Sequence, residues 1–136
     1  MDDCVFCRII DGQIPAAVLV ETDQVISFLD INPINAGHAL VVPKRHVETL
    51  LGLTNDELHA TALVTRRVAA AVIEATSSPA FHVLQNNGES AGQVVKHVHF
   101  HVIPRRPDDG FTLGWRQTQP AAGQLAALQR AIQALL

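Results

Sequence analysis

Three of the seven histidines of the chain alternate with apolar residues in the segment 97–103, which reads His-Val-His-Phe-His-Val-Ile. Side chains alternate between the two faces of a strand, so this pattern predicts a β-strand over about 97–103. One face carries the imidazoles of His97, His99 and His101, and the other face is apolar. Side chains two residues apart lie about 6.5 to 7 Å from each other along a strand, so this row spans one small charged group such as a phosphate or a metal ion.

Two kinds of chemistry fit three imidazoles on one face, because imidazole acts near neutral pH as a base, a nucleophile or a metal ligand. The first is a zinc hydrolase in which His97, His99 and His101 bind the ion and leave one position open. It needs a carboxylate base, for which Asp108 is the only close residue. The second is a nucleophilic histidine flanked by groups that bind phosphate.

The segment 86–92, Asn-Asn-Gly-Glu-Ser-Ala-Gly, precedes the histidines and contains mostly small and amide residues. Its backbone N–H groups and amides are suited to hold an anion. It lacks the lysine and hydroxyl spacing of a P-loop, so no magnesium-nucleotide motif is indicated. A plain hairpin turn explains this loop equally well on its own, but the neighbouring histidines favour phosphate binding.

The elements that position these residues belong to an α+β fold in one domain over residues 1–136. Strands are predicted at 18–21, 25–31, 39–42 and 80–85 in addition to the histidine strand. Helices are predicted at about 8–11, where Gly12 ends one or two helical turns, at 54–76 and from 120 onward. Thr54 and Glu57 form a capping box at the start of the long helix. Its buried stripe is expected at Leu58, Ala62, Thr65, Ala69 and Val72. Pro43 and Pro104 are expected to end the strands before them.

Composition restricts the classes of partner. A net charge of −3 gives no electrostatic basis for binding duplex nucleic acid. No apolar run approaches the roughly 20 residues of a membrane span, and the acidic start Met1-Asp2-Asp3 differs from a basic secretory signal. We therefore expect a cytoplasmic protein without nucleic-acid or membrane partners. Its two cysteines are then thiols or metal ligands rather than a disulfide.

The two cysteines form a Cys4-x-x-Cys7 motif with three interpretations. A redox pair normally follows a strand in a βαβ unit, which the start of this chain does not offer. Two buried thiols are the second interpretation. The third is a structural zinc ion completed by two histidines in a closed tetrahedral site.

Taken together, these motifs resemble the histidine triad family, whose fingerprint is His-apolar-His-apolar-His-apolar-apolar. The likeness extends over nearly the whole chain. The matching motifs are Cys4-x-x-Cys7 with Ile9-Ile10, Phe28-Leu29-Asp30-Ile31-x-Pro33, Gly37-His38-x-Leu40-Val41-x-Pro43-Lys44-x-His46, Asn86-x-Gly88 and Ala91-Gly92-Gln93.

The resemblance implies a nucleotidyl hydrolase or transferase that acts at the α-phosphate of a nucleotide without a catalytic cofactor. His99 would attack phosphorus and form a nucleotidyl-imidazole intermediate that water resolves. His101 and His38 would contact the phosphate oxygens, with Asn86 and Gln93 as amide donors. These neighbours need only position the phosphate and spread its charge.

The resemblance also assigns supporting roles. The carbonyl of His97 would fix the tautomer of His99, and Asp30 would accept hydrogen bonds from the ribose hydroxyls. The purine base would lie among apolar side chains such as Phe6, Ile9 and Phe28. In bacterial members a structural zinc is bound at the positions of Cys4, Cys7, His46 and His97.

The family fold is a five-stranded antiparallel sheet with one long helix, a short N-terminal helix and a C-terminal helix. Two copies pair into a ten-stranded sheet, so a homodimer is expected. The C-terminal extension, about 105–136, contains Trp115, which by the resemblance reaches the pocket of the partner.

Two departures leave the substrate open. Val94 stands where well-studied branches carry a hydroxyl, and the triad is followed by Pro104-Arg105, as in the branch that cleaves dinucleoside polyphosphates such as diadenosine polyphosphates. Nucleoside phosphoramidates are the other candidate substrates. A purine-nucleotide-binding regulatory module without turnover is the alternative of a different class.

Overall fold

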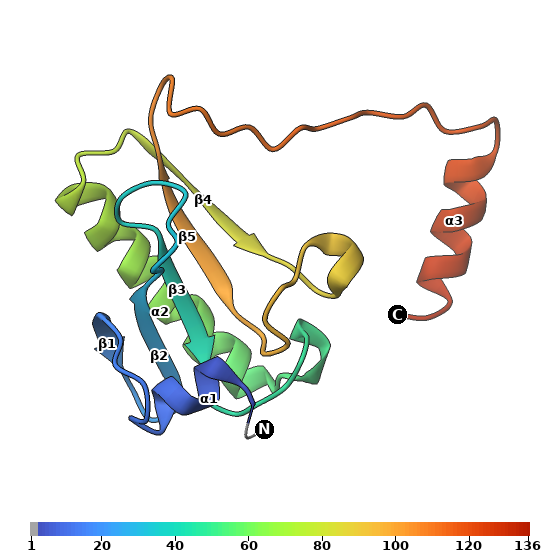
Figure 1. Cartoon of the computed structure of the whole chain (residues 1–136). Helices are drawn as coiled ribbons and strands as arrows, with labels where there is room; N and C mark the ends of the chain where they lie inside the picture. The colour runs from blue at the N-terminus through green and yellow to red at the C-terminus, as the bar shows by residue number, and fades with distance from the viewer. Residues whose placement is uncertain (1–2) are drawn as a thin grey trace.

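The computed structural model describes residues 3–136, so the acidic start Met1-Asp2 lies outside it. Five antiparallel strands form one sheet in the order β1-β2-β3-β5-β4 (Figure 1). The strands are β1 (Val18–Glu21), β2 (Val25–Leu29), β3 (Ala39–Pro43), β4 (Ala80–Gln85) and β5 (Phe100–Arg105). The helices are α1 (Val5–Ile10), α2 (Asn55–Ala75) and α3 (Gln124–Gln133). The predicted α+β class with one long helix is confirmed.

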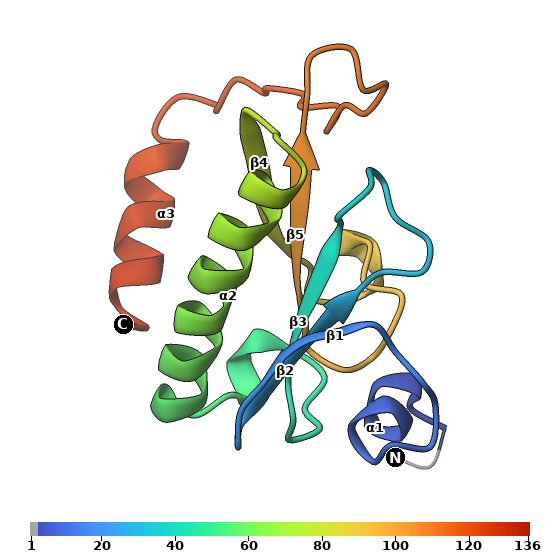
Figure 2. The ribbon, with the colours of Figure 1, turned by 90° about the vertical axis from the view of Figure 1, so that its left-hand side faces the viewer.

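The sheet separates two layers, with α2 against one face and α1 near the other (Figure 2). Strands β2 and β3 are buried on both faces, and their alternating side chains contribute to two core clusters. On the α2 side Val41 packs with Val68 and Val72. On the α1 side Phe6 packs with Phe28. The α1 side also carries the histidines.

Helix α2 begins at the predicted capping box. The Thr54 hydroxyl accepts a hydrogen bond from the Glu57 backbone N–H at 3.2 Å, and the Glu57 carboxylate accepts one from the Thr54 N–H at 2.8 Å. Arg45 pairs with the same carboxylate at 2.6 and 2.7 Å. These bonds lower the pKa of Glu57 to about 2. The ion pair thus ties Arg45, the neighbour of His46, to the start of α2.

The predicted buried stripe of α2 is partly wrong, because Ala62 is exposed and the buried face is centred on Thr61, Val64, Val68 and Val72. Thr61 is fully buried because its hydroxyl donates to the Glu57 carbonyl at 2.6 Å. A threonine satisfied within its own helix loses little by burial. Thr61 therefore lies in the core, whereas the apolar pattern predicts its neighbour Ala62 to be buried.

The histidine strand also differs from the prediction over 97–103, since β5 begins at Phe100 and continues to Arg105. Residues 97–99 do not extend the ladder, because the Val98 N–H donates to the Val47 carbonyl at 2.8 Å. Pro104 lies inside β5, where it pairs with Phe81 of β4 and lies beyond the last β3 pair, at Val102. Its missing N–H therefore breaks no bond on the β3 side. Pro43 likewise lies within its strand, as the last residue of β3.

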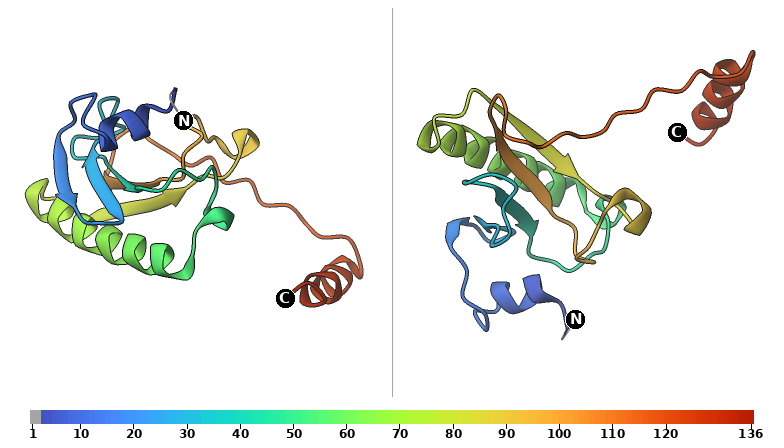
Figure 3. Two further views of the ribbon diagram at one scale, coloured as in Figure 1. Left: turned by 90° about the horizontal axis from the view of Figure 1, so that it is seen from below. Right: turned by 45° about the horizontal axis from the view of Figure 1, so that its top comes forward.

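After β5 hydrogen bonds around Asp109 anchor the chain before it leaves the domain. Arg105 donates to the Asp109 carboxylate at 2.6 and 2.8 Å, and Asn35 donates to the same carboxylate at 2.9 Å. The chain then runs in an irregular path past β4 to α3 (Figures 1 and 3). The helix predicted from residue 120 begins at Gln124. Within the described residues, no helix combines the length and apolar character needed to span a membrane.

Candidate active site and metal centre

A pocket of about 460 Å³ opens on the α1 side of the sheet. Its walls come from α1, from residues 14–16, from the end of β2 and the loop after it, and from the 92–95 segment. His99 and His101 line one side. The predicted base-binding side chains Phe6, Ile9 and Phe28 all lie in these walls. The sequence therefore identified residues that lie together around a single pocket.

The ring of His99 is fixed from both sides. Its Nδ1 lies 2.7 Å from the His97 carbonyl oxygen, and the Phe6 ring packs edge-on with centroids 5.0 Å apart. A carbonyl only accepts hydrogen bonds, so Nδ1 of His99 carries a proton and donates it. Burial lowers the pKa of His99, which keeps the ring neutral. Its Nε2 then holds a free electron pair.

His38 and His101 form a second chain of hydrogen bonds. The Ile34 backbone N–H donates to Nδ1 of His38 at 3.1 Å, so the proton of a neutral His38 must be on Nε2. That Nε2 lies 2.9 Å from Nδ1 of His101 and donates to it. The proton of His101 is then on its Nε2. A neutral His101 is therefore a hydrogen-bond donor beside the electron pair of His99.

Burial keeps both members of this chain neutral. It lowers the pKa of His101 to about 4, with smaller contributions from the neighbouring His99 and His38. Burial also lowers the pKa of His38, and the nearby Asp30 carboxylate opposes this effect. At neutral pH the pocket thus holds uncharged imidazoles in defined tautomers.

Asp30 follows β2 at the edge of the pocket, as predicted. Its Oδ1 accepts the Asn32 N–H at 2.8 Å, and its Oδ2 lies 3.7 Å from Nε2 of His38. The loop is closed by a hydrogen bond from the Asp30 N–H to the His38 carbonyl at 2.9 Å. One carboxylate oxygen is therefore used by the loop, and the other is available to a ligand.

The two predicted amide donors differ in position. The Gln93 side chain is buried and accepts the Gly88 N–H at 2.7 Å. Its Nε2 donates to the carbonyls of Glu48 and Val95 at 2.7 and 3.0 Å. These bonds use its amide to hold the 86–95 segment in place, so a phosphate contact by Gln93 would have to replace them. The Asn86 amide nitrogen instead lies beside Gly92, and Gly92 lines the pocket whereas Asn86 does not.

Cys4, Cys7, His46 and His97 gather their ligand atoms into one cluster beside the pocket. Nδ1 of His97 lies 3.4 Å from Sγ of Cys4 and 3.6 Å from Sγ of Cys7. Nδ1 of His46 lies 3.3 Å from Sγ of Cys7 and 3.2 Å from Nδ1 of His97. Zinc bonds of about 2.05 Å to nitrogen and 2.3 Å to sulfur predict tetrahedral edges of about 3.3 Å for N–N and 3.6 Å for N–S. The cluster therefore has the size and the donors of a closed metal site.

The tautomer of His97 agrees with metal binding. Its Nε2 lies 2.7 Å from the Pro43 carbonyl and must donate to it. The electron pair of His97 is therefore on Nδ1, which faces both cysteines. A metal-binding histidine usually gives its other ring proton to such an acceptor.

A second cluster, formed by Asp30, His38 and His101, has a different character. Here Nε2 of His38 carries a proton, because Nδ1 accepts the Ile34 N–H at 3.1 Å. Metal binding through Nε2 would place a proton on Nδ1, against that N–H. This cluster is therefore arranged as a hydrogen-bond chain. The catalytic zinc alternative is also disfavoured, because His97 directs Nδ1 to the cysteines and not toward His99 and His101.

Two of the groups that fix these tautomers were not predicted. They are the Ile34 N–H and the Pro43 carbonyl, both of the backbone. A backbone group leaves no signal in residue identity, so sequence patterns offer no means to find it.

The HIT domain family matches residues 11–108 of the chain. Adenosine 5'-monophosphoramidase HNT1 of Candida albicans is 41% identical over 117 residues, which cover 82% of this chain and 77% of that protein. The crystal structure of a HIT family member from Bacillus subtilis superposes with a TM-score of 0.93 at 35% identity, covering 98% of this chain and 97% of the other.

A zinc-bound histidine triad family protein from Mycobacterium smegmatis superposes with a TM-score of 0.77 at 33% identity, covering 98% of this chain and 95% of that chain. The superposition on the Bacillus subtilis structure covers so much of the chain that it includes α3 and the segment leading to it.

Proposed function

The chain belongs to the HIT domain family, and on that basis we propose that it is a nucleotidyl hydrolase or transferase of adenosine-type nucleotides. It cleaves the bond between the α-phosphate and the leaving group. Nε2 of His99 attacks phosphorus in line, and the leaving group departs as a nucleotidyl-imidazole intermediate forms. Water, or another acceptor, then attacks the same phosphorus and releases His99.

One observation carries this proposal. The Nδ1 proton of His99 is bound to the His97 carbonyl at 2.7 Å, which leaves the electron pair of Nε2 for phosphorus. The neutral His101 beside it has an N–H to donate to a phosphate oxygen or to the leaving group. Donors already in place where charge develops lower the barrier without reorganising in the transition state.

The pocket favours substrates with a single phosphate. Of the described residues that line it, none is a lysine or an arginine, and Asp30 is acidic. A dinucleoside polyphosphate would bring several further negative charges without a cationic partner in these walls. A nucleoside phosphoramidate carries one phosphate, which the N–H groups of His101 and the loop before the triad can hold. We therefore place phosphoramidates ahead of dinucleoside polyphosphates, with the purine among Phe6, Ile9 and Phe28.

A panel assay tests the function. The native protein, His99→Ala and His59→Ala are each given an adenosine phosphoramidate and diadenosine tetraphosphate. His59 is an exposed histidine of α2 and serves as the matched control. We expect the phosphoramidate to react faster, and His99→Ala to lose roughly 10³-fold or more in kcat/KM, as is usual when a covalent nucleophile is removed.

Equal activity of the native and His99→Ala proteins would refute the mechanism. Binding of AMP by the native protein without turnover of either substrate would instead support the regulatory module. Faster cleavage of diadenosine tetraphosphate would reverse the substrate order.

For the metal centre we propose zinc in a structural role. The two thiolates and two imidazoles are the donors that zinc prefers in closed sites. Such an ion ties Cys4 and Cys7 of the α1 region to His46 and to the first triad histidine. Metal analysis of the purified protein should give one zinc per chain. The need for reduced thiols agrees with a cytoplasmic location.

We further propose a homodimer in which β4 strands of two copies pair into a ten-stranded sheet. Strand β4 is an edge of the sheet, and Phe81 and Val83 on it are 43% and 45% exposed. An unpaired edge with apolar side chains is a surface that proteins usually cover. Sedimentation at micromolar concentration should give the mass of two chains, and a single-chain mass would refute the dimer.

A further inference from the structure

Helix α3 has an apolar face that no other part of residues 3–136 covers. Leu125, Leu128 and Ile132 of α3, and Leu135 just after its end, recur at helical spacing and are between 50% and 88% exposed. Helices shorter than about 12 residues are only marginally stable alone in water. This one spans ten residues, and its N-cap Gly123 supplies no side-chain hydrogen bond. Its stability must therefore come from a surface that covers these side chains.

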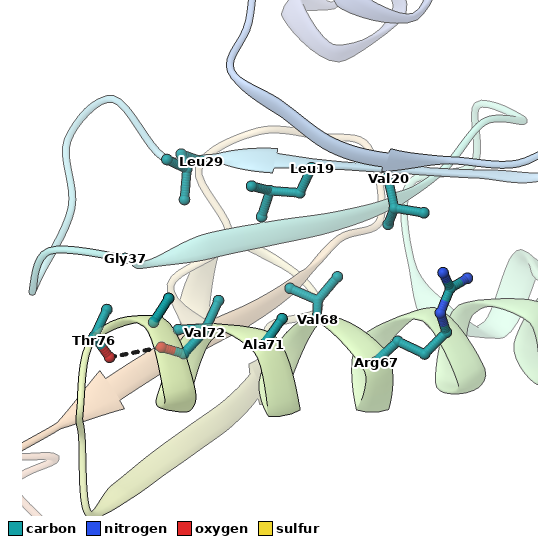
Figure 4. Close-up of a pocket in the computed structure, with 10 residues that line it drawn as sticks. Leu19, Val20, Leu29, Gly37, Arg67, Val68, Ala71, Val72 and Thr76 are labelled. Atoms are coloured by element: carbon teal, nitrogen blue, oxygen red, sulfur yellow. Dashed lines mark hydrogen bonds between the residues drawn. The ribbon is translucent and has the colours of Figure 1, made fainter.

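An apolar groove of about 410 Å³ lies between β1 and the C-terminal half of α2. Figure 4 shows Leu19, Val20 and Leu29 on the strand side, facing Val68, Ala71 and Val72 on the helix side. Thr76 is at one end, and its hydroxyl is already bonded to the Val72 carbonyl at 2.7 Å. Arg67 is at the other end. The groove is thus an apolar surface with no unpaired polar group along its middle.

The groove and α3 of one chain face away from each other. The groove lies at β1, whereas the chain leaves the domain past β4, at the opposite edge of the sheet (Figures 1 and 3). Helix α3 lies beyond that edge, on the α2 side of the sheet (Figure 2). The superposition on a solved relative, which includes α3, indicates that this outward course is shared. The partner of α3 is therefore outside its own chain.

The connecting segment is long enough to reach a second copy. Residues 106–123 span at most about 60 Å when extended. Strands lie about 4.8 Å apart, so crossing from β5 over β4 and the five strands of a copy paired at β4 needs roughly 30 Å. The path ends at the β1 edge of that copy, where its groove lies.

We propose that α3 of each chain docks in the groove between β1 and α2 of a second copy, so that the two chains exchange C-terminal helices. Three aliphatic side chains of α3, and Leu135 just after it, meet a wall of leucine, valine and alanine. Ala71 and Ala75 are small enough to let the two helices approach closely. The inference rests on the dimer proposed above, and it adds a second contact that the pairing of β4 does not require.

Photo-cross-linking tests the exchange in the full-length protein. A benzophenone amino acid replaces Leu128, and in a control it replaces Arg130, which is on the opposite side of α3. After irradiation we expect the Leu128 probe to yield a band of twice the chain mass on a denaturing gel. Mass spectrometry should place the link in residues 19–20 or 67–76, and the Arg130 probe should yield much less of this product.

Substitutions in the groove provide the second arm. Ala71→Arg fills the groove and should reduce the cross-link at least several-fold, whereas Ala70→Arg, an exposed neighbour that does not line the groove, should leave it unchanged. A cross-link within one chain, a link outside the groove, or equal effects of the two arginines would overturn the exchange. Sedimentation separates the outcomes, because absence of the Leu128 cross-link in a dimeric protein whose groove is unaltered refutes the exchange alone, whereas a single-chain mass refutes the dimer as well.

Discussion

Nδ1 of His99 lies 2.7 Å from the carbonyl oxygen of His97, whose own ring points its Nδ1 at the two cysteines of the metal centre. One residue thus serves both sites, with its backbone orienting the proposed nucleophile and its side chain completing the metal cluster. Because residues 97–99 lie outside the sheet ladder, strand hydrogen bonds do not hold this backbone in place. The metal centre is therefore expected to stabilise the position of His99.

Removal of the metal should weaken catalysis without abolishing it. Without an ion, the His97 carbonyl is held less firmly and His99 samples orientations other than the reactive one. We expect kcat to fall by roughly 10-fold, the size typical of lost supporting contacts around a site. The measurement is phosphoramidase activity after exhaustive chelation, with metal content determined on the same sample.

Cys7→Ser should reproduce the effect, and addition of zinc should restore the chelated native protein but not the variant. Complete loss of turnover in a folded, metal-free sample would favour a catalytic metal. Unchanged activity would show that His97 needs no ion to orient His99.

The buried His101 should make the protein sensitive to acid. Its pKa is about 4 in the folded state, against 6.5 for a free imidazole, mainly because of burial. Between these values the unfolded chain binds a proton that the folded chain does not, so the free energy of unfolding falls as the pH decreases from 6.5 toward 4. At pH 5 this residue is therefore expected to lower the free energy of unfolding by about 2 kcal/mol relative to neutral pH.

Urea unfolding of the native protein and of His101→Gln at pH 7 and pH 5 measures this contribution. The variant should lose less stability between the two pH values than the native protein, by about 2 kcal/mol. His59→Gln, at an exposed position, should behave like the native protein. Equal pH dependence of His101→Gln and the native protein would contradict the prediction.

The sequence predicted which side chains meet in the pocket better than it predicted the backbone that holds them. Alternation in 97–103 placed three imidazoles at one site, but only His99 and His101 line the pocket, while the His97 ring belongs to the metal cluster. His97 and His99 also lie before β5 begins. Strand boundaries depend on where neighbouring strands stop, and here Val98 bonds to Val47 and not to a strand. That partner is 51 residues away in sequence, and no local pattern encodes it.

Side-chain type also does not reveal which polar residues already form hydrogen bonds within the fold. Gln93 was predicted from the resemblance to contact phosphate, but three backbone groups use its amide. Thr61 was missed as a core residue because its hydroxyl is satisfied inside α2. In both cases the hydrogen-bond partner, and not the residue, decides the role, and the partner is known only from the fold.

Asp30 should determine affinity for the ribose. One of its carboxylate oxygens is used by Asn32 at 2.8 Å, and the other is available to accept from ribose hydroxyls. Asp30→Ala should raise KM for an adenosine phosphoramidate by roughly 10-fold or more, since a hydrogen bond to a charged group contributes about 1.5 to 3 kcal/mol. The matched substrate is the 2',3'-dideoxy analogue, for which the native protein and the variant should be equally poor. An equal loss with both substrates would show that Asp30 acts on the loop and not on the ribose.

A hydroxyl introduced at position 94 should increase kcat. Its side chain is 89% exposed at the edge of the pocket, so substitution there should leave stability within about 0.5 kcal/mol. Val94→Ser adds a donor near the departing group, and one such hydrogen bond is worth about 1 kcal/mol. We expect kcat for a phosphoramidate of an aliphatic amine to rise by roughly 5- to 10-fold.

Comparison of two leaving groups tests whether the increase in kcat comes from the hydroxyl. A phosphoester with a p-nitrophenolate leaving group needs little help to depart, so Val94→Ser should change its kcat much less than that of the amine substrate. Val94→Ala removes the same methyl groups without adding a donor, and it should match the native protein on both substrates. If Val94→Ala is as fast as Val94→Ser, the gain comes from space at the pocket edge, and the departing group then needs no hydrogen bond from position 94.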